Sequence, residues 1–211
     1  VIGSAALMRQ CAQLAVHHCT ARRAFGKPLL DQPLMRSVLA DLSIESEAAM
    51  TLWVRLAAAL DGAAVGNSAE RDFIRLATAV SKYWICKRAP AVAYEAMECH
   101  GGNGYVEEGP MASLFRQSPL NAIWEGSGNV ICLDVLRAVA KEPASARALF
   151  AELDKSKDVA PPHYGDVVDD LRRTLLGNCD GDGDGTGSRS MRHLAGLEPG
   201  AGGPGGVRQV R

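Results

Sequence analysis

A glutamate near the middle of the chain stands where a catalytic carboxylate would be useful. Glu125 follows Ile123 and Trp124 and precedes Gly126, in a loop ahead of a helix predicted over about 127–141. Apolar neighbours can shield a carboxylate from water, and a shielded carboxylate holds a proton more strongly, as a base working near neutral pH requires. Gly126 removes side-chain bulk beside it, so a flat ligand or another backbone can approach closely. These surroundings are compatible with a general base.

The same residue has a simpler interpretation. A carboxylate near the start of a helix is stabilised by the partial positive charge of the helix N-terminus, and acidic residues are common there. On this pattern alone, Glu125 is more typical of a helix start than of an active site. Both interpretations stay open at this point.

The elements that hold Glu125 are predicted to be helices, because apolar residues recur at spacings of three and four. The stripes are Leu7, Cys11, Leu14 and His18 in the first helix, Leu39, Leu42, Ser46, Ala49, Trp53, Leu56 and Leu60 in the second, and Phe73, Ala77, Val80 and Trp84 in the third. Long helices joined by short loops, with no alternating strand pattern, predict an all-α fold: an antiparallel helical bundle.

Glycines and prolines set the predicted boundaries. The loop 25–28 ends the first helix, 62–66 separates the second from the third, and 101–104 closes the third. Ser68 is predicted to be the N-cap of the third helix, and Pro90 a kink or junction within it. Two further short helices are expected, near 111–116 and over 127–141.

Composition predicts a globular protein followed by a tail. Hydrophobic residues make up 47% of the 211 residues, enough for a sizeable core. We expect one domain over 1–143, a helical extension over 144–176, and a disordered glycine-rich tail over 177–211. The formal net charge of −1 excludes a global basic field for nucleic acid or membranes. With no long apolar run and no leader pattern, a cytoplasmic location is expected. The six cysteines form no CxxC pair, which favours reduced, buried thiols.

Three motifs in order resemble one family. They are Arg22-Arg23-Ala24-Phe25-Gly26-Lys27-Pro28, Met97-Glu98-Cys99-His100-Gly101-Gly102-Asn103-Gly104-Tyr105 and Ile123-Trp124-Glu125-Gly126-Ser127. Residues 1–143 resemble the C-terminal α-helical domain of the acyl-CoA dehydrogenase superfamily, with its R-x-x-F-G-K-P/L, Q-x-x-G-G-x-G-Y/F and I-Y-E-G-T/S segments. The run 121–137, with tryptophan before the glutamate, is most similar to the AidB-like, alkylation-response branch.

The resemblance implies an FAD-dependent dehydrogenase that acts on acyl-CoA and assembles as a homo-oligomer, a tetramer in the family. Glu125 would be the catalytic base that removes the proton α to the thioester carbonyl. Arg22 would contact the FAD pyrophosphate of a neighbouring subunit, where a guanidinium suits phosphate. The other residues implied at the cofactor are Phe25, Gln32, Glu98, Gly101, Gly102, Gly126, Ser127 and Asn129. Trp124 and Arg137 would lie toward the substrate.

Departures from the family pattern weaken the case for fast fatty-acyl oxidation. Glu98 replaces the glutamine of many relatives and puts a carboxylate near an anionic cofactor. Gln117 follows Arg116 where many dehydrogenases have aspartate, and Trp124 would narrow the acyl pocket. The family's N-terminal helical domain and middle β domain, which supply most of the flavin ring site, have no counterpart in the 211 residues. We therefore expect the isolated chain to bind FAD poorly or not at all.

Two other functions stay open: a non-catalytic, DNA-protecting role on the same scaffold, since AidB-like proteins are associated with DNA, and a module that only mediates oligomer contacts. The arginines that could meet phosphates are interleaved with aspartates, which blunts the attraction; they are Arg172, Arg173, Arg189, Arg192, Arg208 and Arg211. Metal sites are not expected. The calcium-like loop 180–185 has Met191 where a ligating glutamate is needed, and the histidines and cysteines of the first helix form no ligand quartet.

Overall fold

The computed structural model describes residues 1–177, so the predicted tail lies outside the described residues apart from Gly177. The chain divides into two compact units, Val1–Leu149 and a second that begins at Phe150. The candidate site residues all belong to the first unit.

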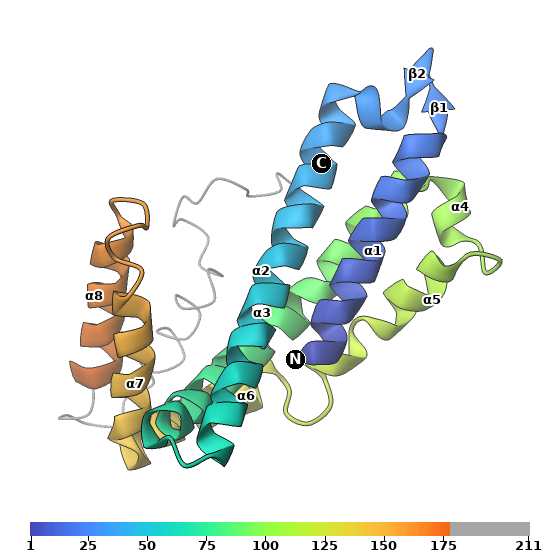
Figure 1. The fold of residues 1–211 in the computed structure, drawn as a ribbon. Helices are drawn as coiled ribbons and strands as arrows, with labels where there is room; N and C mark the ends of the chain where they lie inside the picture. Colours follow the sequence, from blue (N-terminus) through green and yellow to red (C-terminus); the bar gives the residue numbers. More distant parts are fainter. Residues whose placement is uncertain (178–211) are drawn as a thin grey trace. The chain divides into compact units, whose positions relative to one another are not determined.

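Three long helices form the body of the first unit, and each runs antiparallel to the next (Figure 1). They are α1 (Ile2–Ala21), α2 (Pro33–Ala64) and α3 (Ser68–Cys99). The shorter helices that follow are α4 (Gly102–Tyr105), α5 (Pro110–Gln117), the 3-10 turn η2 (Leu120–Ala122) and α6 (Gly128–Lys141). The predicted all-α bundle is confirmed.

Small side chains line the interface between α1 and α3. The buried residues of α1 include Ala5, Met8, Cys11, Ala12, Ala15 and Cys19, and those of α3 include Ile85, Ala89, Val92, Ala93, Ala96 and Cys99. Of the stripe predicted for the first helix, Cys11 is fully buried, and Leu7 and Leu14 are half-buried and pack against the edge of this core. Alanine and cysteine let two helix backbones approach more closely than leucine would, and that close approach fixes the buried face.

One detail of α3 differs from the predictions. The N-cap is Asn67 rather than Ser68, and the Asn67 side chain accepts hydrogen bonds from the amides of Ala69 and Glu70. Pro90 lies inside the helix and does not end it. Proline removes one backbone donor from the helix, but packing over both flanking segments keeps the 32-residue helix continuous.

The loop predicted over 25–28 is part of a small hairpin. Strands β1 (Arg23–Ala24) and β2 (Lys27–Pro28) pair antiparallel, with Ala24 opposite Lys27. The two turn residues both have left-handed backbones, with φ of 53° at Phe25 and 85° at Gly26, as the tightest hairpin turns require. The 3-10 turn η1 (Leu29–Asp31) then leads into α2.

In the C-terminal part, α7 (Pro143–Asp154) crosses the boundary between the units and α8 (Tyr164–Leu176) follows. Phe150, Val168 and Leu175 form the buried cluster of the second unit. Its two described arginines pair with aspartates, Arg172 with Asp154 and Asp169, and Arg173 with Asp170.

Two sequence expectations concern the chain as a whole. The five cysteines among residues 1–177 are free, as predicted, and four of them are buried. Among those residues no helix is long and apolar enough to cross a membrane.

The core of α3 can be tested with a pair of isoleucines. Ile85 is fully buried between α1 and α3, so Ile85→Ala should lower the free energy of unfolding by about 2–5 kcal/mol through lost burial and a residual cavity. Ile44 on α2 is 66% exposed, so Ile44→Ala should change it by less than about 0.5 kcal/mol. Urea titration followed by far-UV circular dichroism measures both. Equal losses in the two variants would contradict the packing described.

Candidate functional site

A cavity of about 310 Å³ lies where the C-terminal ends of α1 and α3 meet the start of α2. It brings together four of the predicted cofactor residues, Arg22, Glu98, Gly101 and Gly102. A Cβ atom added to Gly101 or Gly102 would meet nothing within 4 Å, so the space beside both backbones is open. Gly101 also has φ of 60°, which a residue with a side chain rarely adopts. The cavity therefore presents bare backbone to a ligand.

The cavity wall gathers basic groups. Arg22 caps α1, and His18 lies one turn before it on the same face. The rings of His18 and His100 stack with centroids 4.6 Å apart, and His100 Nδ1 lies 2.8 Å from the carbonyl oxygen of Ala96. The C-terminal ends of helices favour cations. The helix ends therefore suit Arg22 itself, whose guanidinium can pair with an anionic ligand, while Glu98 and the helix carbonyls oppose one.

Burial controls the protonation of two cavity residues. It lowers the pKa of His18 below its ordinary value, and the nearby His100 and Arg22 lower that pKa further. Burial raises the pKa of the Cys99 thiol to about 12. Cys99 is thus a protonated thiol in the cavity wall and not a nucleophile.

Five predicted cofactor residues do not line this cavity: Gly126, Ser127 and Asn129 belong to the Glu125 turn, and Phe25 and Gln32 belong to the hairpin region. Phe25 stands at the hairpin tip with 94% of its surface exposed. Gln32 is the N-cap of α2, and its Nε2 donates to the carbonyl oxygen of Ala24 at 3.2 Å. In this chain Gln32 stabilises the hairpin through that hydrogen bond, and Phe25 is exposed at its tip.

Glu125 lies in a left-handed turn at the opposite end of α1. Its φ is 53° and that of Gly126 is 105°. A non-glycine residue in this conformation costs roughly 1–3 kcal/mol, and such strain is concentrated at functional sites. The prediction that the neighbouring apolar residues shield Glu125 is wrong for this chain by itself, because Glu125 is exposed, with Ile123 at 63% and Trp124 at 53%. Those side chains are themselves more than half exposed, so they do not give the carboxylate a buried environment.

Hydrogen bonds tie the turn to the bundle. Trp124 Nε1 donates to Asn121 Oδ1 at 3.0 Å, and Asn121 Nδ2 donates to Ser4 Oγ at 3.0 Å. Ser4 is buried at the start of α1 and donates to the Cys86 sulfur of α3. A further contact comes from the Lys82 ammonium on α3, which reaches the backbone of the turn.

The helix after the turn packs tightly on α3. Ser127 is the N-cap of α6, and Gly128 is buried so closely that an added Cβ would lie 2.9 Å from Lys87 Cε and 3.1 Å from Tyr83 Cε2. Ser127 and Asn129 are exposed beside Glu125. Arg137 is also exposed, two to three turns along α6, and lies 3.5 Å from Asp134.

The two halves of the predicted site are separated along α3. Lys82 marks the Glu125 turn and Cys99 marks the cavity, and the 17 residues between them correspond to roughly 25 Å of helix. The structure thus assembles Arg22 with the glycine loop, and Glu125 with Trp124, Gly126, Ser127 and Asn129. It does not bring the two groups together in one chain.

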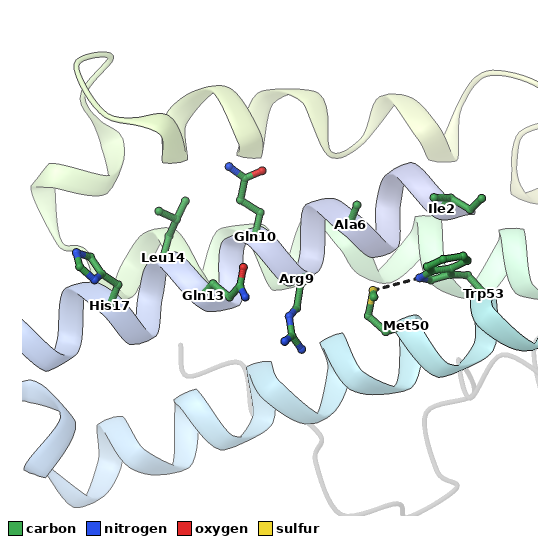
Figure 2. Close-up of a pocket in the computed structure, with 9 residues that line it drawn as sticks. All are labelled: Ile2, Ala6, Arg9, Gln10, Gln13, Leu14, His17, Met50 and Trp53. Atoms are coloured by element: carbon green, nitrogen blue, oxygen red, sulfur yellow. Dashed lines mark hydrogen bonds between the residues drawn. The ribbon is translucent and has the colours of Figure 1, made fainter.

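A larger cavity of about 530 Å³ lies between α1 and α2 (Figure 2). It is lined by Ile2, Ala6, Arg9, Gln10, Gln13, Leu14, His17, Met50 and Trp53. The Trp53 indole donates to the Met50 sulfur at 3.1 Å along one wall. None of the predicted site residues lines this cavity, so it stands apart from the candidate site.

The C-terminal domain of the acyl-CoA dehydrogenases matches residues 1–140 of this chain. The chain belongs to that family. Over 141 residues it is 46% identical to AidB of Escherichia coli (strain K12), an alignment that covers 67% of this chain and 26% of AidB. The predicted similarity to the AidB-like branch of the acyl-CoA dehydrogenases is confirmed.

Two solved structures of acyl-CoA dehydrogenases extend the comparison. ACDH-11 of Caenorhabditis elegans, in complex with C11-CoA, matches with a TM-score of 0.77 at 27% identity and covers 92% of this chain and 36% of that one. Butyryl-CoA dehydrogenase from Megasphaera elsdenii matches with a TM-score of 0.57 at 27% identity, covering 64% and 33%. The chain therefore spans 26–36% of the length of these three relatives.

Three residues at the acyl-CoA dehydrogenase-like site were missed by the sequence predictions. His18 was assigned to a helical stripe and weighed as a metal ligand, but not placed beside the cofactor, although its spacing of four from Arg22 puts both on one face. Asn103 lies inside the glycine loop that was singled out and also lines the cavity. No sequence pattern indicated Lys82, because the residues that it contacts lie 42 to 44 positions further along the chain.

The lowered pKa of His18 predicts a pH-dependent stability. Because the folded state disfavours the protonated form, the unfolded state takes up more protons as the pH falls through 6.5. The free energy of unfolding should therefore be fully present above pH 6.5 and decrease below it. His18→Phe keeps a ring against His100 and should flatten this decrease, as measured by urea midpoints at pH 7.5 and 5.5. His163→Phe, at an exposed histidine, is the control and should keep the wild-type slope.

Proposed function

We propose that this chain supplies the catalytic base and part of the cofactor site of an FAD-dependent dehydrogenase acting between the α and β carbons of an acyl-CoA thioester. The observation that carries the proposal is the strained, exposed turn at Glu125, placed at the start of α6 by bonds to α1 and α3. Such a turn aims a carboxylate outward toward a ligand. The C11-CoA complex of ACDH-11 supports an acyl-CoA as that ligand.

The residues of the cavity fit the phosphates of FAD. Arg22 offers a guanidinium suited to phosphate, and the open space beside Gly101 and Gly102 leaves room for a ligand to approach the backbone. Glu98 opposes an anion, and its hydrogen bond with Tyr94, which raises the pKa of Tyr94, holds part of that carboxylate. When bound, FAD supplies the acceptor for the hydride that leaves the β carbon.

Glu125 performs the proton transfer in this proposal. The carboxylate accepts the proton from the α carbon, and the electrons of that C–H bond form the new double bond as the β hydride departs. Trp124 and Ile123 flank the carboxylate and provide apolar surface for the acyl group. Trp124 is held by Asn121, so its indole forms a fixed wall of the substrate site.

The same geometry implies that a second polypeptide completes the site. The cavity and the Glu125 turn lie roughly 25 Å apart along α3, so one chain can contribute Arg22 to one cofactor and Glu125 to another. Four large apolar residues near the turn are more than half exposed: Ile123, Trp124, Val130 and Leu133. An exposed apolar group of this kind marks an interaction surface, and we propose a homo-oligomer in which it is covered.

The base is tested by Glu125→Gln, which removes the proton acceptor and keeps the shape. In the flavin-containing protein, anaerobic bleaching of the flavin absorbance by an acyl-CoA should slow by about 10²–10⁴-fold, while flavin content stays unchanged. Glu108→Gln, at an exposed glutamate after α4, is the matched control and should bleach at the wild-type rate. Undiminished bleaching in the Glu125 variant would remove Glu125 as the base.

The cofactor cavity is tested by Arg22→Met and Gly102→Leu. Loss of a charge-assisted hydrogen bond should weaken FAD binding on the order of 10- to 100-fold, and a leucine side chain at residue 102 should fill the open space without destabilising the fold. Quenching of flavin fluorescence measures the affinity, and Arg36→Met, an exposed charge at the start of α2, is the control. Unchanged affinity in both cavity variants would show that FAD does not bind there.

A further inference from the structure

We propose that Lys82 is the positioning residue for Glu125, because its ammonium group holds the backbone of the turn and so sets where the carboxylate points. The catalytic meaning of this inference rests on the proposed function of Glu125. The hold on the turn does not depend on it, and the experiments below separate the two.

The ammonium group makes three hydrogen bonds to three successive residues. Lys82 Nζ donates to the carbonyl oxygens of Trp124 at 2.8 Å, Glu125 at 3.3 Å and Gly126 at 2.8 Å. A lysine ammonium has three N–H donors and no acceptor, so the turn uses its whole hydrogen-bonding capacity. The two shorter distances are typical of charge-assisted bonds, which are about twice as strong as neutral ones.

The lysine reaches the turn from a rigid part of the fold. Lys82 is half-buried in the middle third of α3, and its neighbour Ser81 and the residue one turn further, Ile85, are buried in the bundle. The turn belongs to a loop between η2 and α6, whose own backbone has few helical bonds to fix it. The bonds therefore transfer the position of α3 to the loop.

The bonds also match the strain in the turn. Three successive carbonyl oxygens converge on one nitrogen while Glu125 and Gly126 both have positive φ. A residue with a side chain leaves that conformation unless surrounding contacts hold it. The Asn121 contact holds the loop only as far as Trp124, and the packing of Gly128 holds it only after Ser127. Among the contacts described for residues 1–177, those of Lys82 act on the strained pair itself.

Lys82 acts on the backbone and not on the carboxylate. Its three bonds go to carbonyl oxygens, so removing it should move the Glu125 side chain without changing the proton acceptor itself. This distinguishes a positioning residue from one that tunes the charge of the base.

The hold is tested in the 211-residue chain with Lys82→Met, which keeps the length of the stem and removes the donors. Amide hydrogen exchange at Trp124, whose N–H donates to the carbonyl oxygen of Leu120 at 3.1 Å, should become about tenfold faster or more as the turn loosens. The three-bond HN–Hα coupling of Glu125, measured by NMR, should move away from the value for a left-handed residue. Lys141→Met, at the exposed end of α6, is the matched control and should leave both quantities unchanged. Wild-type exchange and coupling in Lys82→Met would overturn the inference.

A second variant separates geometry from charge. Lys82→Arg keeps the positive charge, but a guanidinium is planar and carries its N–H groups on separate nitrogens. It therefore cannot donate from one nitrogen to three carbonyl oxygens. The coupling at Glu125 should therefore change in Lys82→Arg as in Lys82→Met. Full recovery of the wild-type coupling with arginine would show that charge alone holds the turn, which contradicts the positioning geometry.

Measurements of turnover test the catalytic consequence of the inference. In the flavin-containing protein, Lys82→Met should lower kcat by about 100-fold, the cost of a small displacement of a reacting group, with KM and the midpoints of the pH–rate profile unchanged. A shifted midpoint would show that Lys82 acts on the charge of Glu125 and would overturn the inference. If Lys82→Met alters the turn but Glu125→Gln stays active, the hold is supported and the proposed function fails.

Discussion

The close contact between α1 and α3 is the constraint on which the other features depend. Alanine and cysteine side chains fill it, so the two backbones lie near each other over most of the length of α1. A helix packed this closely is stiff, because interior packing leaves few voids and transmits displacement. Lys82 in the middle of α3 and Cys99 at its end are thereby kept at a fixed separation. The Glu125 turn and the Arg22 cavity are held apart by the same length of helix.

Regular elements were predictable from the sequence, and local departures from regularity were not. Helical spacing located all the helices of the first unit longer than one turn, because burial with a period near 3.6 leaves a direct trace in residue type. The buried alanines of α1, such as Ala5 and Ala15, were not predicted, because small side chains contribute little to a hydrophobic pattern. They nevertheless mark the tightest contact.

The candidate site divides in the same way. Arg22, Gly101 and Gly102 could be named from their motifs, and the fold brings them to one cavity. The positive φ of Glu125 and the contacts of Lys82 and Asn121 depend on pairs of residues 42 to 117 positions apart in the sequence. No local pattern encodes such pairs. The exposure of Glu125 was mispredicted for a related reason: apolar neighbours in sequence shield a carboxylate only if the backbone turns them over it.

The separation along α3 also keeps the two chemistries electrically apart. A base must be unprotonated to accept a proton and must not be paired permanently with a guanidinium, whereas a phosphate site needs uncompensated positive charge. At roughly 25 Å along the helix, Arg22 lies well beyond the Debye length of about 8 Å at physiological ionic strength, so its field is largely screened at Glu125. The nearest described cation to the turn, Lys82, has its donors directed at carbonyl dipoles. A long, stiff helix therefore keeps the proposed anion-binding end of this small domain apart from the proposed proton-accepting end, so that the two do not neutralise each other.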